Sequence, residues 1–205
     1  MTNLCLPVSL GEAIDKLTIL DIKVDKIKDH RKEDVQKEYD LLYIALREFI
    51  VNYETLYQTM KKVNLLIWDM MDILRDGNVT EEVYLKKCKE CIEYNDVRFR
   101  VKNKINNVSG SLLKEQKSYT INRLIICIPI EIDNPLLIKI IHYFSFMYDE
   151  IIIDTFEEHL KEHFKYDTTI LFKESECIDY KRKVVIDSDN LLELFHITEE
   201  KLNLF

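Results

Sequence analysis

Apolar residues recur every three or four positions along the first half of the chain, which predicts a series of amphipathic helices. The first helix begins at the capping box Ser9-Leu10-Gly11-Glu12 and should run to about His30. Its first half is apolar on nearly every side, so its charged side chains need partners, because an unpaired buried charge is costly. Those side chains belong to Glu12, Asp15, Lys16 and Asp21. We expect them to pair with one another or with cations elsewhere in the fold, for which Arg98 and Lys102, farther along the chain, are the obvious candidates.

The next apolar stripe runs from Val35 to Leu74 at the same alternating spacing. It predicts one long coiled-coil-like helix, or two helices in register. The sequence after it is a good helix stop, because Gly77 can take the left-handed conformation, and Thr80 can begin a further helix. We therefore expect an antiparallel bundle of three long helices over residues 1–119, whose long helix also favours self-association.

From Ile121 onward the pattern changes to short, β-branched apolar runs separated by helical stretches. The expected strands cover residues 124–130, 150–154, 168–172 and 183–187. Helix starts are expected at Asn134-Pro135, at the Thr155–Glu158 capping box, and at Asp187 or Ser188, where a last helix should run through Phe195. Alternating strands and helices predict a small α/β domain over residues 120–205 with a mainly parallel sheet of about four strands. The fold class is therefore α+β, a helical bundle followed by a small α/β domain.

Charge is distributed unevenly along the 205 residues. Up to Tyr119 there are 20 basic and 20 acidic side chains, whereas from Thr120 there are 9 basic and 17 acidic ones. An acidic surface repels a phosphate backbone, so we expect no nucleic-acid partner. A metal ion or a basic partner fits this charge better. No apolar run approaches the roughly 20 residues that cross a bilayer, so no membrane anchor is expected.

The cysteines indicate a reducing compartment. An odd number of them, without a basic and then apolar leader, does not fit a secreted disulfide framework, so a cytoplasmic location is expected. Cys88 and Cys91 lie within a predicted helix and should pack in the core rather than bind metal. Only two Ala and three Gly, against abundant Ile, Asn, Lys and Tyr, indicate an AT-rich genome, such as that of a giant virus, a protist or an AT-rich bacterium.

A polar stretch in the predicted third helix is the best functional clue. One stripe of that helix turns from apolar to polar partway along its length; its members are Tyr84, Cys88, Cys91, Asn95, Arg98, Lys102 and Ile105. Together with Glu12, Asp15 and Lys16 it could line a pocket for an anionic ligand, in which Arg98 would grip phosphate or carboxylate oxygens in pairs. The alternative is an internal ion-pair network that fixes the register of the helices. The sequence leaves both open.

Two short motifs raise the question of a metal. A predicted strand runs into Asp187-Ser188-Asp189, which is similar to the motif that holds Mn²⁺ or Mg²⁺ in one class of sugar-nucleotide transferases; helix capping is the alternative. His159-Leu160-Lys161-Glu162-His163 matches the H-x-x-E-H pattern of one metalloprotease group, without an evident third ligand. The three glycines all lie in the helical part, so the usual glycine-rich diphosphate loop is missing and no cofactor is expected in a standard site.

Three motifs in the helical part resemble a bacterial domain family of unknown function. They are residues 11–20 (GEAIDKLTIL), 94–98 (YNDVR) and 115–119 (EQKSY), so the resemblance covers about residues 8–119. The family looks like a small helical bundle often encoded near, or fused to, glycosyltransferases and surface-polysaccharide genes. The resemblance thus implies a role in glycan or nucleotide-sugar metabolism. The positions that match the family pattern are Glu12, Asp15, Lys16, Asn95, Asp96, Arg98 and Lys117.

These observations favour a noncatalytic binding or assembly module. Its polar stripe would take a sugar phosphate or a nucleotide sugar, and its long helices would bind a protein partner or a second copy. The first alternative is a divalent-metal enzyme acting on nucleotide sugars, with Asp187 and Asp189 on the metal and Arg98 or Lys102 on the phosphates. The second is a purely structural, self-associating protein.

Overall fold

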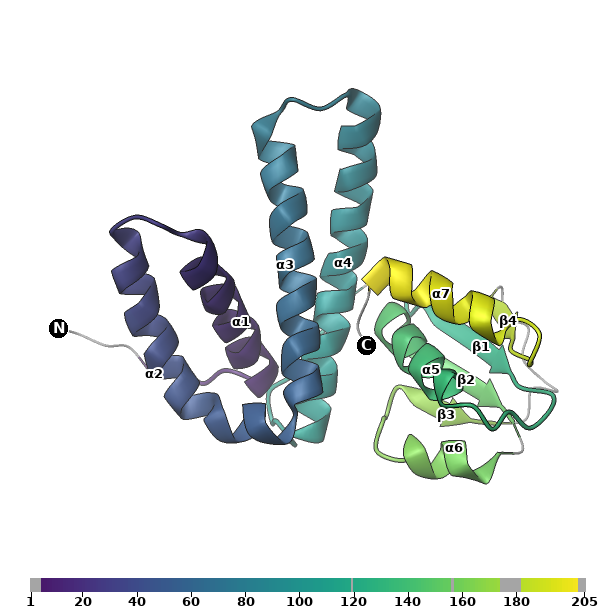
Figure 1. Ribbon diagram of the computed structural model, residues 1–205. Coiled ribbons are helices and arrows are strands. Elements are labelled where there is room, and N and C mark those ends of the chain that lie inside the picture. The colour runs from purple at the N-terminus through teal and green to yellow at the C-terminus, as the bar shows by residue number, and fades with distance from the viewer. Residues whose placement is uncertain (1–4, 119, 156, 174–181, 203–205) are drawn as a thin grey trace. The chain divides into compact units, whose positions relative to one another are not determined.

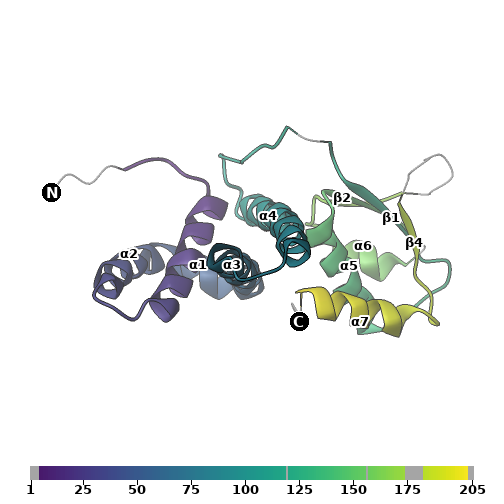
Figure 2. The same cartoon turned by 90° about the horizontal axis from the view of Figure 1, so that it is seen from above.

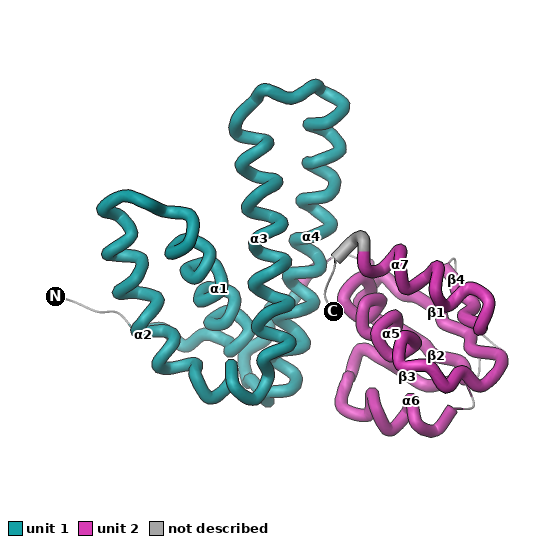
Figure 3. Tube along the Cα trace, in the orientation of Figure 1, with its two compact units in different colours: residues 1–116 teal, residues 117–205 magenta. Residues whose placement is uncertain are grey.

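The computed structural model describes residues 5–118, 120–155, 157–173 and 182–202. They fall into two compact units, residues 1–116 and residues 117–205 (Figure 3). The first unit is helical and the second holds a four-stranded sheet with its helices. The predicted α+β layout, a helical bundle followed by a small α/β domain, is confirmed.

The helices of the first unit form two hairpins, α1 with α2 and α3 with α4 (Figure 1). Helix α1 is the central element, because it also packs against α3 and α4, and Ile14, Leu17 and Leu20 on different sides of it are buried. Seen from above, α1 lies between α2 and α3 (Figure 2). The four helices are α1 (Leu10–Lys26), α2 (Arg31–Asn52), α3 (Glu54–Asp76) and α4 (Glu81–Val108).

Local sequence signals account for several helix ends. Ser9 caps α1 by accepting a hydrogen bond from the Glu12 backbone N–H at 3.2 Å, as predicted. Gly77 ends α3 in the left-handed conformation with φ of 72°, and Thr80 caps α4. Helix α1 ends at Lys26 rather than near His30. The turn after it is held by the Asp29 carboxylate, which accepts from the Arg31 N–H at 3.0 Å and competes with continued helix.

The stripe from Val35 to Leu74 forms two helices, α2 and α3, which is the second of the two possibilities, so the bundle has four helices and the count of three is wrong. The break is at Tyr53, where φ is −133° and ψ is 45°. Ile50 and Val51 are β-branched and Asn52 bonds readily to non-helical backbone, so the helix is weakest there. Tertiary packing completes the division, since α2 packs mainly on α1 whereas α3 packs on both α1 and α4.

The second unit contains a parallel sheet with strand order β3-β2-β1-β4, which confirms the predicted small α/β fold. The strands are β1 (Arg123–Cys127), β2 (Glu150–Asp154), β3 (Ile170–Phe172) and β4 (Lys183–Val185). Three strands are shorter than predicted for identifiable reasons. Pro129 has no N–H to continue β1, and the turns at Asp167 and Asp187 shorten β3 and β4.

One face of this sheet carries the core of the second unit. Leu124 and Ile126 of β1 and Ile151 and Ile153 of β2 pack with buried residues of three helices. In both views α5, α6 and α7 lie on the same side of the sheet (Figures 1 and 2). These helices are α5 (Pro135–Met147), α6 (Glu158–His163) and α7 (Leu191–Leu202).

Three helix ends in the second unit differ from prediction, whereas Asn134 caps α5 as expected. Glu157, not Thr155, is the N-cap residue of α6; the Thr155 hydroxyl accepts from the Glu157 N–H at 3.2 Å in a tight turn. Glu157 is buried, and its Oε1 atom accepts a hydrogen bond from the Ile132 N–H at 2.9 Å. Phe156, in the predicted capping box, lies outside the described residues. Helix α7 begins at Leu191, after the turn of residues 188–190 rather than at Asp187 or Ser188, and it continues past Phe195 to Leu202.

Candidate functional site

The polar seam is the set of side chains that α1, α3 and α4 bring together in the first unit. Its centre is Asp15 of α1, which is 3% exposed. The Arg98 guanidinium of α4 donates to both oxygens of Asp15, from Nε to Oδ1 at 2.8 Å and from Nη2 to Oδ2 at 2.5 Å. Paired hydrogen bonds of this kind are the strongest carboxylate contact that a side chain makes. The seam consists of Glu12, Asp15, Thr18, Asn64, Arg98, Lys102 and Glu115.

Helix α3 contributes one polar side chain to the seam. The amide of Asn64 donates to Asp15 Oδ1 and to the Thr18 hydroxyl, both at 2.9 Å. The Thr18 hydroxyl in turn donates to the Asp15 backbone carbonyl at 2.9 Å. Sequence analysis missed Asn64 and Thr18. The available signal is that Asn64 is a polar residue within the apolar stripe of α3, beside buried Val63.

Lys102 is the second cation of the seam and joins three segments. Its ammonium group lies 2.6 Å from Glu12 Oε1 and also forms an ion pair with Glu115, which follows α4. Burial lowers the pKa of Lys102, but the hydrogen bonds to Glu115 and Glu12 outweigh it, so the pKa is raised overall. The hydrogen bond to Asp15 raises the pKa of Arg98 as well. Both cations therefore keep their charge, as the burial of charged residues on α1 led us to expect.

The seam is closed at one end by a direct approach of α1 to α4. The Gly11 N–H donates to Oδ1 of the fully buried Asn106 at 2.7 Å. A Cβ atom on Gly11 would stand only 2.6 Å from the Lys102 carbonyl oxygen, so the contact requires glycine. Neither Asn106 nor this role of Gly11 was predicted.

The remaining predicted seam residues lie elsewhere. Lys16 is exposed and forms an ion pair with Glu38 of α2 at 2.6 Å. Asn95 is also exposed, and its amide donates to the Cys91 carbonyl of its own helix at 3.0 Å. Asp96 is partly buried on α4, and Lys117 is partly buried in the second unit. Tyr119, the last residue of the third motif, lies outside the described residues.

Asp187 and Asp189 lie in the turn between β4 and α7. The Asp187 Oδ1 atom accepts from the backbone N–H groups of Asp189 and Asn190, both at 3.0 Å. Asn190 returns the contact, because its Oδ1 atom accepts from the Asp187 N–H at 3.1 Å. These bonds lie within the turn of residues 188–190, and α7 begins only at Leu191, so Asp187 holds the turn and does not cap the helix directly. It stands next to β1, where the strand order reverses and ligands of parallel sheets bind.

Within the part of the chain that the structure describes, the cysteines and histidines form no cluster with three metal ligands. Among the described residues, no group of three or more His, Cys, Asp or Glu is placed to hold a metal ion. The Cys91 Sγ atom lies 3.9 Å from the thioether sulfur of Met71 on α3, and burial raises the pKa of its thiol. Such a thiol keeps its proton, which fits core packing. Cys5, Cys88, Cys91 and Cys127 are free thiols, and Cys177 lies outside the described residues.

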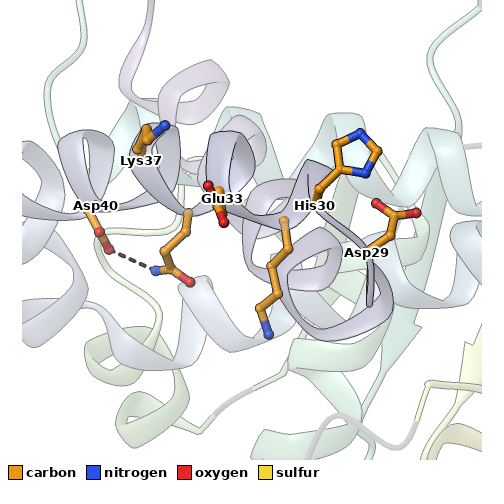
Figure 4. Close-up of a pocket in the computed structure, with 7 residues that line it drawn as sticks. Asp29, His30, Glu33, Lys37 and Asp40 are labelled. Atoms are coloured by element: carbon orange, nitrogen blue, oxygen red, sulfur yellow. Dashed lines mark hydrogen bonds between the residues drawn. The ribbon is translucent and has the colours of Figure 1, made fainter.

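A shallow hollow of about 610 Å³ lies over the turn between α1 and α2. Figure 4 shows its side chains spread along the first turns of α2, with Gln36 bonded to Asp40 at 2.9 Å. The acidic Asp29, Glu33 and Asp40 alternate with Lys32 and Lys37, so the hollow has no dominant charge to select a ligand. It is also at the opposite end of α1 from Glu12 of the seam.

No described helix has both the length and the apolar character required to cross a lipid bilayer.

The family model described as "Family of unknown function (DUF6165)" matches residues 4–135 of the chain. The chain belongs to this family. The DUF6165 match covers the whole polar seam and extends beyond the three motifs to include β1 and the start of α5. No curated protein and no solved structure matches the chain.

Proposed function

We propose that this DUF6165 protein is a noncatalytic, cytoplasmic assembly module that binds a second copy of itself through α2. The observation that carries the proposal is an apolar face of α2 that no described helix of the first unit covers. Leu41, Ile44 and Val51 are 72%, 75% and 73% exposed, although the chain has buried the other apolar face of α2 at Leu46 and Phe49. The motif resemblance supports a setting in glycan or nucleotide-sugar metabolism.

The α2 face is the stripe formed by Lys37, Leu41, Ile44, Glu48 and Val51. Its members alternate in steps of four and three, the spacing of a helix that packs along another helix. Contiguous exposed apolar residues of this kind are typical of interaction surfaces. Helix α2 carries four basic and five acidic side chains. Two α2 helices would therefore repel each other only weakly, although the whole chain has a net negative charge.

An antiparallel pair of α2 helices is self-complementary. When Leu41 is placed opposite the partner subunit's Ile44, the spacing places Lys37 opposite the partner subunit's Glu48. Two-fold symmetry repeats this pair at the other end of the stripe. Opposite charges that face each other along the stripe favour this register over others.

The polar seam supports the assembly role by holding the bundle together. Both of its cations are engaged by carboxylates of the same chain, so an anionic ligand would have to displace Asp15 from Arg98, or Glu12 and Glu115 from Lys102. The three carboxylates also outnumber the two cations. This balance favours the internal ion-pair network over an anion pocket.

The experiment is the molar mass of the full chain by sedimentation equilibrium over a range of concentrations. We expect a dimer, and we expect Ile44→Glu to convert it to monomer. Lys37→Glu should weaken the dimer, and adding Glu48→Lys should restore it, because the swapped charges again face each other. The control is Leu192→Glu, which changes a 60% exposed leucine of α7. A monomeric wild-type chain at every concentration would rule out the proposal.

Ligand binding is tested separately, by thermal unfolding against nucleotide sugars and sugar phosphates, each with and without Mn²⁺. A ligand that binds the native state raises the midpoint by mass action. A shift without metal that Arg98→Met abolishes, while the variant remains folded, would support the anion pocket.

The second candidate function is a divalent-metal enzyme acting on nucleotide sugars. Its support is the position of Asp187 and Asp189 beside β1, where the strand order of the sheet reverses. A Mn²⁺-dependent turnover that Asp187→Asn removes would favour it over the assembly module.

A further inference from the structure

Two histidines distant in sequence meet in the second unit. The Nε2 atoms of His142, on α5, and His163, the last residue of α6, are 3.3 Å apart. The rings are nearly perpendicular, at 75°, with centroids 5.5 Å apart. The H-x-x-E-H motif would instead pair His163 with His159, but His159 is exposed and lies 3.2 Å from the buried carboxylate of Glu157.

We propose that His142 and His163 bind a Zn²⁺ ion between their Nε2 atoms, with water in the remaining positions. Zn²⁺ bonds imidazole nitrogen at about 2.0–2.1 Å in tetrahedral geometry, which places two ligand nitrogens about 3.3–3.4 Å apart. The observed separation of 3.3 Å fits this span. The same distance allows a hydrogen bond between the two rings when no metal is bound, and the ion would replace that bond.

The rings are held in place before a metal arrives. The buried ring of Phe164 packs edge-on against both imidazoles, with centroids 4.8 Å from His142 and 4.7 Å from His163. The Ser145 hydroxyl donates to the His142 carbonyl at 2.7 Å and supports the helix that carries it. A fixed ligand pair loses little conformational freedom when it binds an ion.

From Thr120 onward the sequence has 17 acidic and 9 basic side chains, so this part of the chain has a net negative charge that does not oppose a cation. Neutral imidazole is also a preferred ligand of zinc. The ion would bridge α5 and α6, which the chain otherwise joins through β2.

The experiment is a Zn²⁺ titration of the reduced, full-length protein against a chromophoric chelator, with circular dichroism to check the fold of each variant. We expect one ion per chain. We expect His142→Gln and His163→Gln each to weaken binding more than about tenfold, since losing even an outer partner of a metal ligand costs about that much. His159→Gln is the matched control in the same helix and should bind as the wild type does.

Three results would overturn the proposal. They are no binding by the wild-type protein, equal affinity in all three variants, or retention of the ion by both His142→Gln and His163→Gln. The first would leave the pair as an imidazole contact, and the other two would assign the ion to different ligands. Thermal unfolding with and without Zn²⁺ gives a second readout, because only variants that bind should show a raised midpoint.

Discussion

Arg98 and Asp15, 83 residues apart in the sequence, are joined by two hydrogen bonds between α4 and α1. Asp15 is almost completely buried, whereas the Arg98 side chain is 28% exposed. The pair therefore places a desolvated carboxylate within reach of a cation that remains partly hydrated. A change to Arg98 must affect stability mainly through the carboxylate left behind.

Replacing Arg98 by Met should lower the free energy of unfolding by about 3 kcal/mol, because Asp15 is left buried without its counter-charge. Urea denaturation followed by circular dichroism measures this. Lys16→Met is the control; it removes an exposed ion pair and should cost less than about 1 kcal/mol. Adding Asp15→Leu to Arg98→Met should recover much of the loss. Equal stability of Arg98→Met and wild type would contradict the stabilising role of the Arg98–Asp15 pair.

Gly11→Ala should destabilise the first unit by about 1–3 kcal/mol, although alanine is the better helix former by about 1 kcal/mol. The added Cβ would meet the Lys102 backbone oxygen at 2.6 Å, so α1 must move away from α4. Hydrogen exchange of the Gly11 amide, which donates to Asn106, measures the separation directly.

Gly77→Ala is the comparison for this variant, because it adds the same atom where nothing lies within 4 Å. It should cost about 1–2 kcal/mol through its positive φ and leave the exchange at residue 11 unchanged. If Gly11→Ala kept the wild-type stability and the wild-type protection of the residue 11 amide from hydrogen exchange, α1 and α4 would be able to accept the added Cβ atom without loss of stability.

The charged residues of α1 show how far sequence reasoning reached. Charges on an apolar helix require partners, and this argument named Arg98 and Lys102, which bind Asp15 and Glu12. It did not name Lys61, which forms an ion pair with Asp21. It could not choose Asn64, since an amide has no charge to balance and its role depends on which turn of α3 faces Asp15. Helical periodicity determines a face but not the axial position of a neighbouring helix.

Other features depended on contacts between distant segments. The division of α2 from α3 at Tyr53 follows from different packing partners, which a continuous apolar stripe does not record. The meeting of His142 with His163 arises because α5 and α6 cover the same face of the sheet. The spacing of the H-x-x-E-H motif pairs His163 with His159 and gives no sign of His142.

Tyr57→Phe should lower stability at neutral pH by about 1.5 kcal/mol, because the Tyr57 hydroxyl donates to Asp21 Oδ2 at 2.9 Å. Burial, followed by the charge of Asp21 and this hydrogen bond, raises the pKa of Tyr57. The unfolded chain therefore loses the proton first. The contribution of Tyr57 to stability is complete below about pH 10 and declines by about 1.4 kcal/mol for each further pH unit.

The phenylalanine variant lacks this decline, so the stability difference from wild type should narrow between pH 9 and 11. Guanidinium denaturation at several pH values measures the difference. Tyr166→Phe changes an exposed tyrosine and should follow the wild-type curve. A constant gap between Tyr57→Phe and wild type across this pH range would contradict the assignment.

Asp187→Ala should cost about 1 kcal/mol, because it removes the acceptor of two backbone N–H groups in the turn that precedes α7. Asp187→Asn should remain close to wild type, since its side-chain carbonyl can accept the same two bonds. Thermal unfolding without added metal compares the three proteins. An Asn variant as unstable as the Ala variant would mean that the negative charge at residue 187, rather than hydrogen bonding to the turn, stabilises this end of the sheet. Hydrogen bonding within the turn would then not be enough to explain the role of Asp187 in the D-x-D motif.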